Sequence, residues 1–254
     1  MIKPGLVSIT FRKLAPQDVI RLALEAQLCG IEWGGDVHVP HGDFDRARQV
    51  GRMTREAGLE VAAYGSYYRI DNESELPFEK VLETAACLEA PVIRVWAGTR
   101  PSESADDAYQ RKITLESSRI AEAAAKAGVA VAYEFHRNTL TDTNKSALRL
   151  LKGVDHPNMK IYWQPPHNAP AEYCLEGLKA VLPKLAHLHV FNWRLDADGQ
   201  TERQPLGEAE ERWTRYLATV KAAGTDHFAM LEFVREDRPE NLMEDSKILN
   251  HWLA

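Results

Sequence analysis

Hydrophobic residues along the chain recur in short, nearly continuous runs, separated by longer segments in which apolar and polar positions follow a helical period. Strands that are buried on both faces, as in a parallel sheet, have such continuous apolar runs. We therefore predict eight strands, at residues 6–10, 30–33, 60–64, 92–96, 129–135, 160–163, 186–191 and 228–233.

The segments between these runs are typical of amphipathic helices. Residues 19–26, for example, place apolar side chains at the i, i+3, i+4 and i+7 positions of one helical face. Glycine favours the left-handed backbone conformation in which many helices end. We expect four glycines that follow a helical pattern and precede a strand to end helices in this way: Gly30, Gly58, Gly128 and Gly224.

The alternation of strands and helices predicts a closed (β/α)8 TIM barrel, because eight strand–helix cycles fit a chain of 254 residues and this fold typically takes about 250. An open, doubly wound sheet is the alternative. Its nucleotide site would need a glycine-rich first turn, and residues 9–13 contain no glycine. No linker or shift in composition interrupts the chain, so we expect a single barrel domain over residues 1–254.

Charge and composition narrow the class of protein. The chain has 31 Lys and Arg against 37 Asp and Glu, a formal net charge of −6, and no basic run for nucleic acid or anionic lipid. No apolar stretch approaches the roughly 20 residues that span a bilayer, and no signal peptide is evident. Cys29, Cys87 and Cys174 are far apart and indicate free thiols. We expect a cytoplasmic protein that binds neither nucleic acid nor membranes.

Polar side chains end the last four predicted strands, where a TIM barrel carries its active site. These residues are Glu134, Gln164, His189 and Glu232. Two carboxylates, an amide oxygen and an imidazole suit one divalent ion, and we favour Mn²⁺ over Mg²⁺, Co²⁺ and Zn²⁺. A lone buried carboxylate costs several kcal/mol, which argues against a purely structural role for either glutamate. We expect both to move a proton on a carbon next to a carbonyl group.

Further residues near the strand ends are candidates for substrate contact. His136 lies two residues after Glu134, Trp96 ends the fourth strand and can stack on a sugar, and His38 and Tyr64 follow or end the second and third strands. Each also has a structural interpretation, such as loop support or core packing.

The same strand ends, together with WGGDVH at residues 33–38 and VWAG at residues 95–98, resemble the xylose isomerase-like barrel superfamily. Within it the chain resembles the sugar phosphate isomerase/epimerase group over essentially its whole length. The resemblance implies that Glu134 and Glu232 are metal ligands as well as the acid/base pair, and that His189 completes the metal sphere. It also implies that His167 and Arg194 contact the substrate.

Position 164 departs from this group, which usually has an aspartate there. A neutral Gln164 predicts weaker metal affinity and a stronger Lewis acid than an aspartate would give. Two other interpretations stay open at this point: Gln164 binds substrate beside a metal with three protein ligands, or the metal has been lost.

Our main functional hypothesis is a metal-dependent sugar isomerase or epimerase that acts through an enediolate. The alternative is a lyase or dehydratase acting on an oxidised (keto) sugar or glycoside, because both reactions begin with proton removal next to a ketone. A non-catalytic sugar-binding barrel is a third hypothesis, and the acidic charge argues against a DNA-repair endonuclease of the superfamily. The expected partner is a small-molecule sugar without phosphate. Barrels of this group often pair, so a homo-oligomer stays open.

Overall fold

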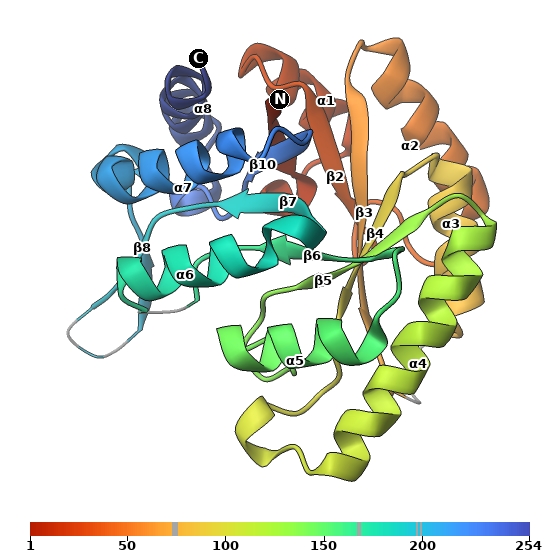
Figure 1. The fold of residues 1–254 in the computed structure, drawn as a ribbon. Coiled ribbons are helices and arrows are strands. Elements are labelled where there is room, and N and C mark those ends of the chain that lie inside the picture. The colour runs from red at the N-terminus through yellow and green to blue at the C-terminus, as the bar shows by residue number, and fades with distance from the viewer. Residues whose placement is uncertain (73–75, 167–168, 197, 199) are drawn as a thin grey trace.

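The computed structural model describes residues 1–72, 76–166, 169–196, 198 and 200–254. Its centre is a closed barrel of eight parallel strands, which confirms the predicted (β/α)8 fold (Figure 1). In barrel order the strands are β1 (Ile2–Val7), β2 (Gly30–Gly34), β3 (Glu60–Arg69), β4 (Val92–Trp96), β5 (Ala130–Glu134), β6 (Met159–Trp163), β7 (Leu185–Val190) and β10 (His227–Leu231).

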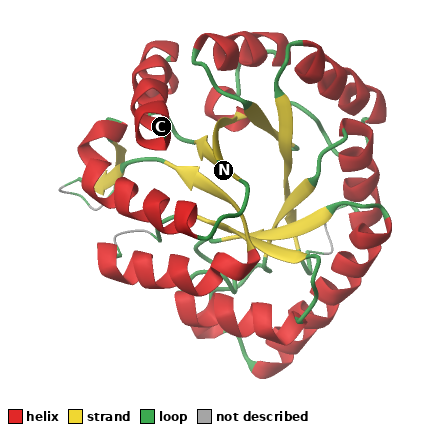
Figure 2. Ribbon diagram, turned by 45° about the horizontal axis from the view of Figure 1, so that its top comes forward, coloured by secondary structure: helices red, strands yellow, loops and turns green. Residues whose placement is uncertain are grey.

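Helices form the outer layer of the barrel, as Figure 2 shows. Their apolar faces pack on the outside of the strands and build the main hydrophobic core, while the amide and carbonyl groups of the strands pair around the closed sheet. The helices are α1 (Pro16–Glu25), α2 (Phe44–Glu56), α3 (Phe78–Leu88), α4 (Asp107–Lys126), α5 (Asn144–Val154), α6 (Ala171–Val181), α7 (Glu210–Ala222) and α8 (Pro239–Leu253).

A second, smaller core fills the inside of the barrel, and two glycines make room for it. Gly5 of β1 and Gly30 of β2 lie opposite each other in the parallel ladder. A Cβ atom on Gly5 would lie 2.8 Å from Cγ of Met230, and one on Gly30 would lie 2.7 Å from the ring of Phe228. These two large side chains therefore fill the barrel below the strand ends, and the free space lies at the carboxyl end.

The helix ends follow the predicted glycine pattern with one exception. Gly58, Gly128 and Gly224 adopt positive φ angles of 83°, 71° and 72° after α2, α4 and α7. Gly30 does not end α1, and the expectation is wrong there: Gln27 takes the left-handed position with a φ of 55°, and Gly30 is the first residue of β2. The close approach of Phe228 explains that glycine instead.

The first strand lies earlier in the chain than its apolar run predicted. The expected strand at 6–10 is corrected to β1, which ends at Val7, and the next residues form a short 3₁₀ helix, η1 (Ser8–Phe11). Side-chain hydrogen bonding favours this turn, because Ser8 Oγ accepts a bond of 2.9 Å from the Gly34 amide and lies 2.9 Å from His38 Nδ1.

A small antiparallel hairpin follows β7 and was not predicted. It consists of β8 (Trp193–Leu195) and β9 (Thr201–Arg203), paired from Trp193 opposite Arg203 to Leu195 opposite Thr201. Its three-residue strands are too short and too polar for a sequence pattern to reveal. In the part of the chain that the structure describes, no helix combines the length and apolar character needed to span a membrane.

Candidate functional site

A cavity of about 650 Å³ opens at the carboxyl ends of the barrel strands. Three of the four polar residues predicted to meet there, Glu134, Gln164 and Glu232, are on its wall. The remaining wall is rich in aromatic and arginine side chains, namely Tyr67, Trp96, Phe135, Phe191, Trp193, Phe233, Arg12, Arg137 and Arg203. The cavity therefore combines a carboxylate floor with flat apolar surfaces and cationic groups.

Glu134, His189 and Glu232 form a compact, buried cluster. Their ligand atoms all lie within 4.8 Å of one another, although the residues come from β5, from β7 and from the position directly after β10. Oε2 of Glu232 is buried and lies 3.2 Å from His189 Nδ1, but within the described residues it makes no hydrogen bond. A buried carboxylate needs a cation beside it, which a protonated His189 or a metal ion can supply, and this set of oxygen and nitrogen donors fits a divalent metal ion.

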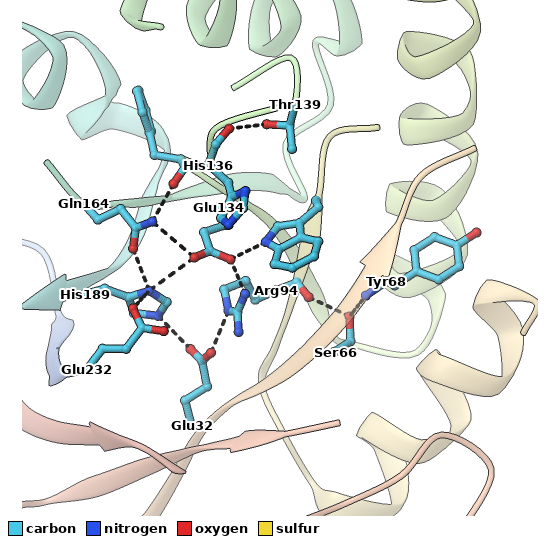
Figure 3. A network of polar contacts seen from close by, with 12 residues as sticks. Glu32, Ser66, Tyr68, Arg94, Glu134, His136, Thr139, Gln164, His189 and Glu232 are labelled. Carbon is cyan, nitrogen blue, oxygen red and sulfur yellow. Dashed lines mark hydrogen bonds and ion pairs between the residues drawn. The ribbon is translucent and has the colours of Figure 1, made fainter. Parts of the chain in front are cut away.

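Gln164 lies beside this cluster, directly after β6, with its amide held in one orientation (Figure 3). Its Nε2 donates to the Phe135 carbonyl oxygen at 2.6 Å and to Glu134 Oε1 at 3.2 Å. Its Oε1 is thereby directed at His189, 3.0 Å from Nδ1. The amide oxygen thus faces the same space as the Glu134, His189 and Glu232 ligand atoms and can serve as a neutral fourth ligand.

Two charged residues inside the strands complete the network, and sequence analysis missed both. Arg94 in the middle of β4 donates from Nε to Glu32 Oε1 at 2.6 Å and from Nη1 to Glu134 Oε2. Glu32, in the middle of β2, lies with Oε2 3.3 Å from His189 Nε2. Together with Gln164, these contacts close a ring of polar groups around the barrel interior (Figure 3).

A signal for Glu32 and Arg94 was present in the sequence. Each is a lone charge within an otherwise apolar strand, and such charges are buried only when they are paired. The structure shows that they are each other's partners, and both are at most 1% exposed.

The electrostatics of the ring favour ionised carboxylates. Burial alone raises the pKa of Glu32 and of Glu134, but Arg94 and His189 outweigh burial and hold both pKa values below their usual range. Burial lowers the pKa of His189, whereas Glu232 and Glu32 raise it to about 10. Arg94 balances one of the two charges on Glu32 and Glu134, and a proton on His189 or a metal cation beside it can balance the other.

Trp96 and His136 both line the cavity, as their positions after the strands predicted. Trp96 donates from Nε1 to Glu134 Oε2, and its ring lies 4.5 Å from the His136 ring, centroid to centroid, with 31° between the planes. Arg69 covers the Trp96 ring at 3.8 Å. Their contact with a substrate stays a prediction.

Three of the other candidates do not reach the cavity, and their expected pocket position is corrected. His38 is buried between Ser8 Oγ and the Leu14 carbonyl oxygen, 3.2 Å from its Nε2. Tyr64 does not reach the cavity because β3 continues to Arg69, so the end of the strand lies five residues beyond Tyr64. Its hydroxyl group instead donates to the Val39 carbonyl oxygen at 2.7 Å.

Arg194 is the third of these candidates. It lies on the exposed face of β8, where its Nε donates to Glu202 Oε2 at 2.9 Å, and the cavity wall does not include it. His167, expected to contact substrate, lies outside the described residues. Tyr67 takes the place on the cavity wall that was expected of Tyr64, after a register shift in β3 between Gly65 and Tyr68.

Known proteins match the chain along nearly its whole length. Residues 20–252 match the family described as the xylose isomerase-like TIM barrel. The chain is 27% identical to the 3-dehydroshikimate dehydratase of Bacillus anthracis, over 98% of this chain and 97% of the relative. The crystal structure of the probable 3-DHS dehydratase AsbF from Bacillus anthracis superposes with a TM-score of 0.82 and 25% identity, over 98% of this chain and 99% of that one.

More distant solved structures share the fold. A xylose isomerase-like TIM barrel protein from Mycobacterium smegmatis in complex with magnesium has a TM-score of 0.75 and 17% identity, over 100% of this chain and 98% of that one. A D-psicose 3-epimerase crystallised in the presence of D-fructose has a TM-score of 0.72 and 14% identity, over 98% of both chains.

These matches correct the functional hypothesis drawn from the sequence. The expectation of a sugar isomerase or epimerase is wrong, because the curated relative that covers the chain is a dehydratase, and a dehydratase is a lyase. The epimerases share only the fold. The error has a physical source: both reactions start by removing a proton next to a ketone, so the strand-end residues alone do not separate them.

Proposed function

Because the chain belongs to the xylose isomerase-like TIM barrel family, we propose that it is a metal-dependent dehydratase acting on a hydroxylated keto compound. 3-Dehydroshikimate, the substrate named for the relative, is the first candidate. The observation that carries this proposal is the buried cluster of Glu134, His189 and Glu232, whose two carboxylates line the cavity. Such a set of bases beside a cation can remove water from a β-hydroxy ketone.

The metal would be held by Glu134, His189 Nδ1 and Glu232, with Gln164 Oε1 as the neutral fourth ligand. These oxygen and nitrogen donors favour Mn²⁺, with Mg²⁺, Co²⁺ or Zn²⁺ as alternatives. When bound, the cation polarises the ketone oxygen of the substrate and so acidifies the neighbouring C–H bond. The compactness of the cluster supports this assignment, because one ligand atom each of Glu134, His189 and Glu232 lies within 4.8 Å of the others.

The two glutamates have unequal surroundings, and this inequality assigns the base. Oε2 of Glu134 accepts hydrogen bonds from Arg94 and Trp96, which spread its negative charge. Oε2 of Glu232 accepts none from the described residues. We therefore assign proton removal from the carbon next to the ketone to Glu232, and the electrons of the broken C–H bond form the new C=C bond as the hydroxyl group leaves.

His136 is the candidate acid for the leaving hydroxyl group. It lines the cavity, and its Nδ1 is committed to the Arg137 carbonyl oxygen at 2.7 Å. Its Nε2 is therefore the ring nitrogen that can deliver a proton, so that the hydroxyl group leaves as water. Trp96 lies against this imidazole and donates from Nε1 to Glu134, so it connects the candidate acid with the carboxylate cluster.

The test is incubation of the purified, Mn²⁺-loaded protein with 3-dehydroshikimate, followed by mass spectrometry. We expect loss of one water per substrate and loss of activity when a chelator removes the metal. Glu232→Gln should lower kcat by at least about a hundredfold, whereas Glu176→Gln, an exposed carboxylate on α6, should leave it unchanged. Isomerised substrate without loss of water would contradict the proposal.

A further inference from the structure

Three arginines line the cavity of this acidic protein: Arg12, Arg137 and Arg203. The carboxylates on the same wall are Glu134, Glu232 and Asp142, and the first two face the proposed metal. A divalent cation there would neutralise their charge. The remaining wall would then carry more positive than negative charge, which suits an anionic ligand rather than a neutral sugar.

Two of these three guanidinium groups already have carboxylate partners. Arg12 pairs with Asp36, and Arg203 pairs with Asp237 and also donates to the Val234 carbonyl oxygen at 3.1 Å. The side chain of Arg137, by contrast, forms neither an ion pair nor a hydrogen bond with the residues that the structure describes. Of the three, Arg137 is the one whose charge is left for a ligand.

The other wall carboxylate does not neutralise Arg137. Asp142 accepts a hydrogen bond from the Ser102 amide on Oδ2, at 2.8 Å. Its Oδ1 is buried and, within the described ranges, has no hydrogen-bond partner. Asp142 thus offers an acceptor to a substrate hydroxyl group, while Arg137 offers a cation.

The backbone that carries Arg137 is fixed relative to the carboxylate cluster. Arg137 lies three residues after Glu134, and its carbonyl oxygen accepts from His136 Nδ1. Asn138 follows in the left-handed conformation, with a φ of 60°. Thr139 Oγ1 donates back to the His136 carbonyl oxygen at 2.7 Å, a bond visible in Figure 3. The turn therefore holds the base of the arginine at a set place on the rim of the site.

We propose that Arg137 is a specificity-determining residue that binds the carboxylate of the substrate, so that the cavity selects hydroxylated keto acids over neutral keto sugars. The planar guanidinium group binds a carboxylate through two parallel N–H···O bonds, which a neutral sugar cannot accept in the same way. This inference rests on the proposed dehydratase function, whose substrate class it narrows.

The test compares two ligands that differ only at the carboxyl group, shikimate and its uncharged methyl ester, by isothermal titration of the Mn²⁺-loaded protein. Neither carries the ketone required for turnover. We expect the wild type to prefer shikimate, and Arg137→Gln to weaken shikimate binding about tenfold or more while leaving the ester unaffected. The affinity of Arg137→Lys for shikimate should lie between that of the wild type and that of Arg137→Gln. Arg111→Gln is the matched control, an exposed arginine on α4 outside this cavity.

Kinetics with 3-dehydroshikimate give an independent measure. Arg137→Gln should raise KM about tenfold with a much smaller change in kcat, as expected for a residue that binds the carboxylate away from the reacting carbon. Equal affinity of the wild type for both ligands, or an equal loss of both in Arg137→Gln, overturns the inference. An Arg137-dependent preference for shikimate in a protein that does not dehydrate 3-dehydroshikimate would support the inference and reject the proposed reaction.

Discussion

Glu32 and His189 meet inside the barrel, with Oε2 of the glutamate 3.3 Å from Nε2 of the imidazole. Both residues are fully buried. A metal-binding histidine usually donates its second ring N–H to a carboxylate, which fixes the tautomer and the orientation of the ring. The contact with Glu32 leaves His189 Nδ1 facing Gln164 and Glu232, on the side where a metal would sit.

Glu32→Gln is therefore expected to weaken Mn²⁺ binding about tenfold to a hundredfold, because loss of this carboxylate makes His189 a poorer and less well oriented ligand. Isothermal titration of the metal-free protein measures this without reference to catalysis. Glu60→Gln, an exposed glutamate at the start of β3 that pairs with Lys3, should leave the affinity unchanged. Equal affinities in wild type and Glu32→Gln would refute the role given to Glu32.

Gln164→Asp is expected to bind Mn²⁺ about tenfold more tightly than the wild type, because it adds a negative charge beside the cation. It should also destabilise the metal-free protein by about 1–3 kcal/mol, since an aspartate cannot donate to the Phe135 carbonyl oxygen as the amide does. Metal titration and denaturant unfolding measure the two effects separately. Unchanged metal affinity would show that position 164 is not a ligand.

Gly65→Ala should destabilise the protein by about 1–3 kcal/mol, because the new methyl group would press on a buried ion pair. A Cβ atom on Gly65 would lie 2.6 Å from Glu32 Oε1 and 2.9 Å from Arg94 Nη2. Gly153→Ala on α5 is the matched control: its Cβ would make an ordinary 3.4 Å contact with Thr114, so a small gain in stability is expected. Denaturant midpoints that are equal for the two variants would contradict the tight packing around the pair.

Asp245 on α8 is expected to make the free energy of unfolding depend on pH. Burial raises its pKa to about 6 from an ordinary value of 3.8, although its Oδ1 accepts from the Leu206 amide at 3.0 Å. The folded protein therefore holds a proton that the unfolded chain releases between about pH 4 and 6. The contribution is most favourable at acid pH and is lost as the pH rises through about 6.

Asp245→Asn removes the titrating group, and with it this pH dependence, but keeps a hydrogen-bond acceptor for the Leu206 amide. It should raise the free energy of unfolding by about 1–3 kcal/mol at pH 7.5 and by clearly less at pH 4.5. Urea unfolding at both pH values measures the difference, and Glu244→Gln, an exposed neighbour, should change it by less than about 0.5 kcal/mol. A gain of equal size at both pH values would argue against the titration of Asp245.

The candidate site divides into residues that local patterns reveal and residues that they do not. Four of the site residues could be predicted because each is a polar residue near the carboxyl end of an apolar strand, where a TIM barrel carries its active site. They are Glu134, Gln164, His189 and Glu232. Glu32 and Arg94 are equally central, but they lie within strands, and only the closed sheet shows that they pair with each other and with His189 and Glu134.

The amino-acid sequence by itself determined the barrel, since the apolar periods and turn residues of β/α units are local and repeat along the chain. It also determined which side chains stand at the rim, because a strand end is a local feature. Tertiary structure decided which of them meet. The continuation of β3 beyond Tyr64 left that side chain outside the cavity, and the register shift after Gly65 placed Tyr67 on its wall. The turn after β5 directed Arg137 to the same wall. Such contacts join segments distant in sequence, and no local pattern encodes them.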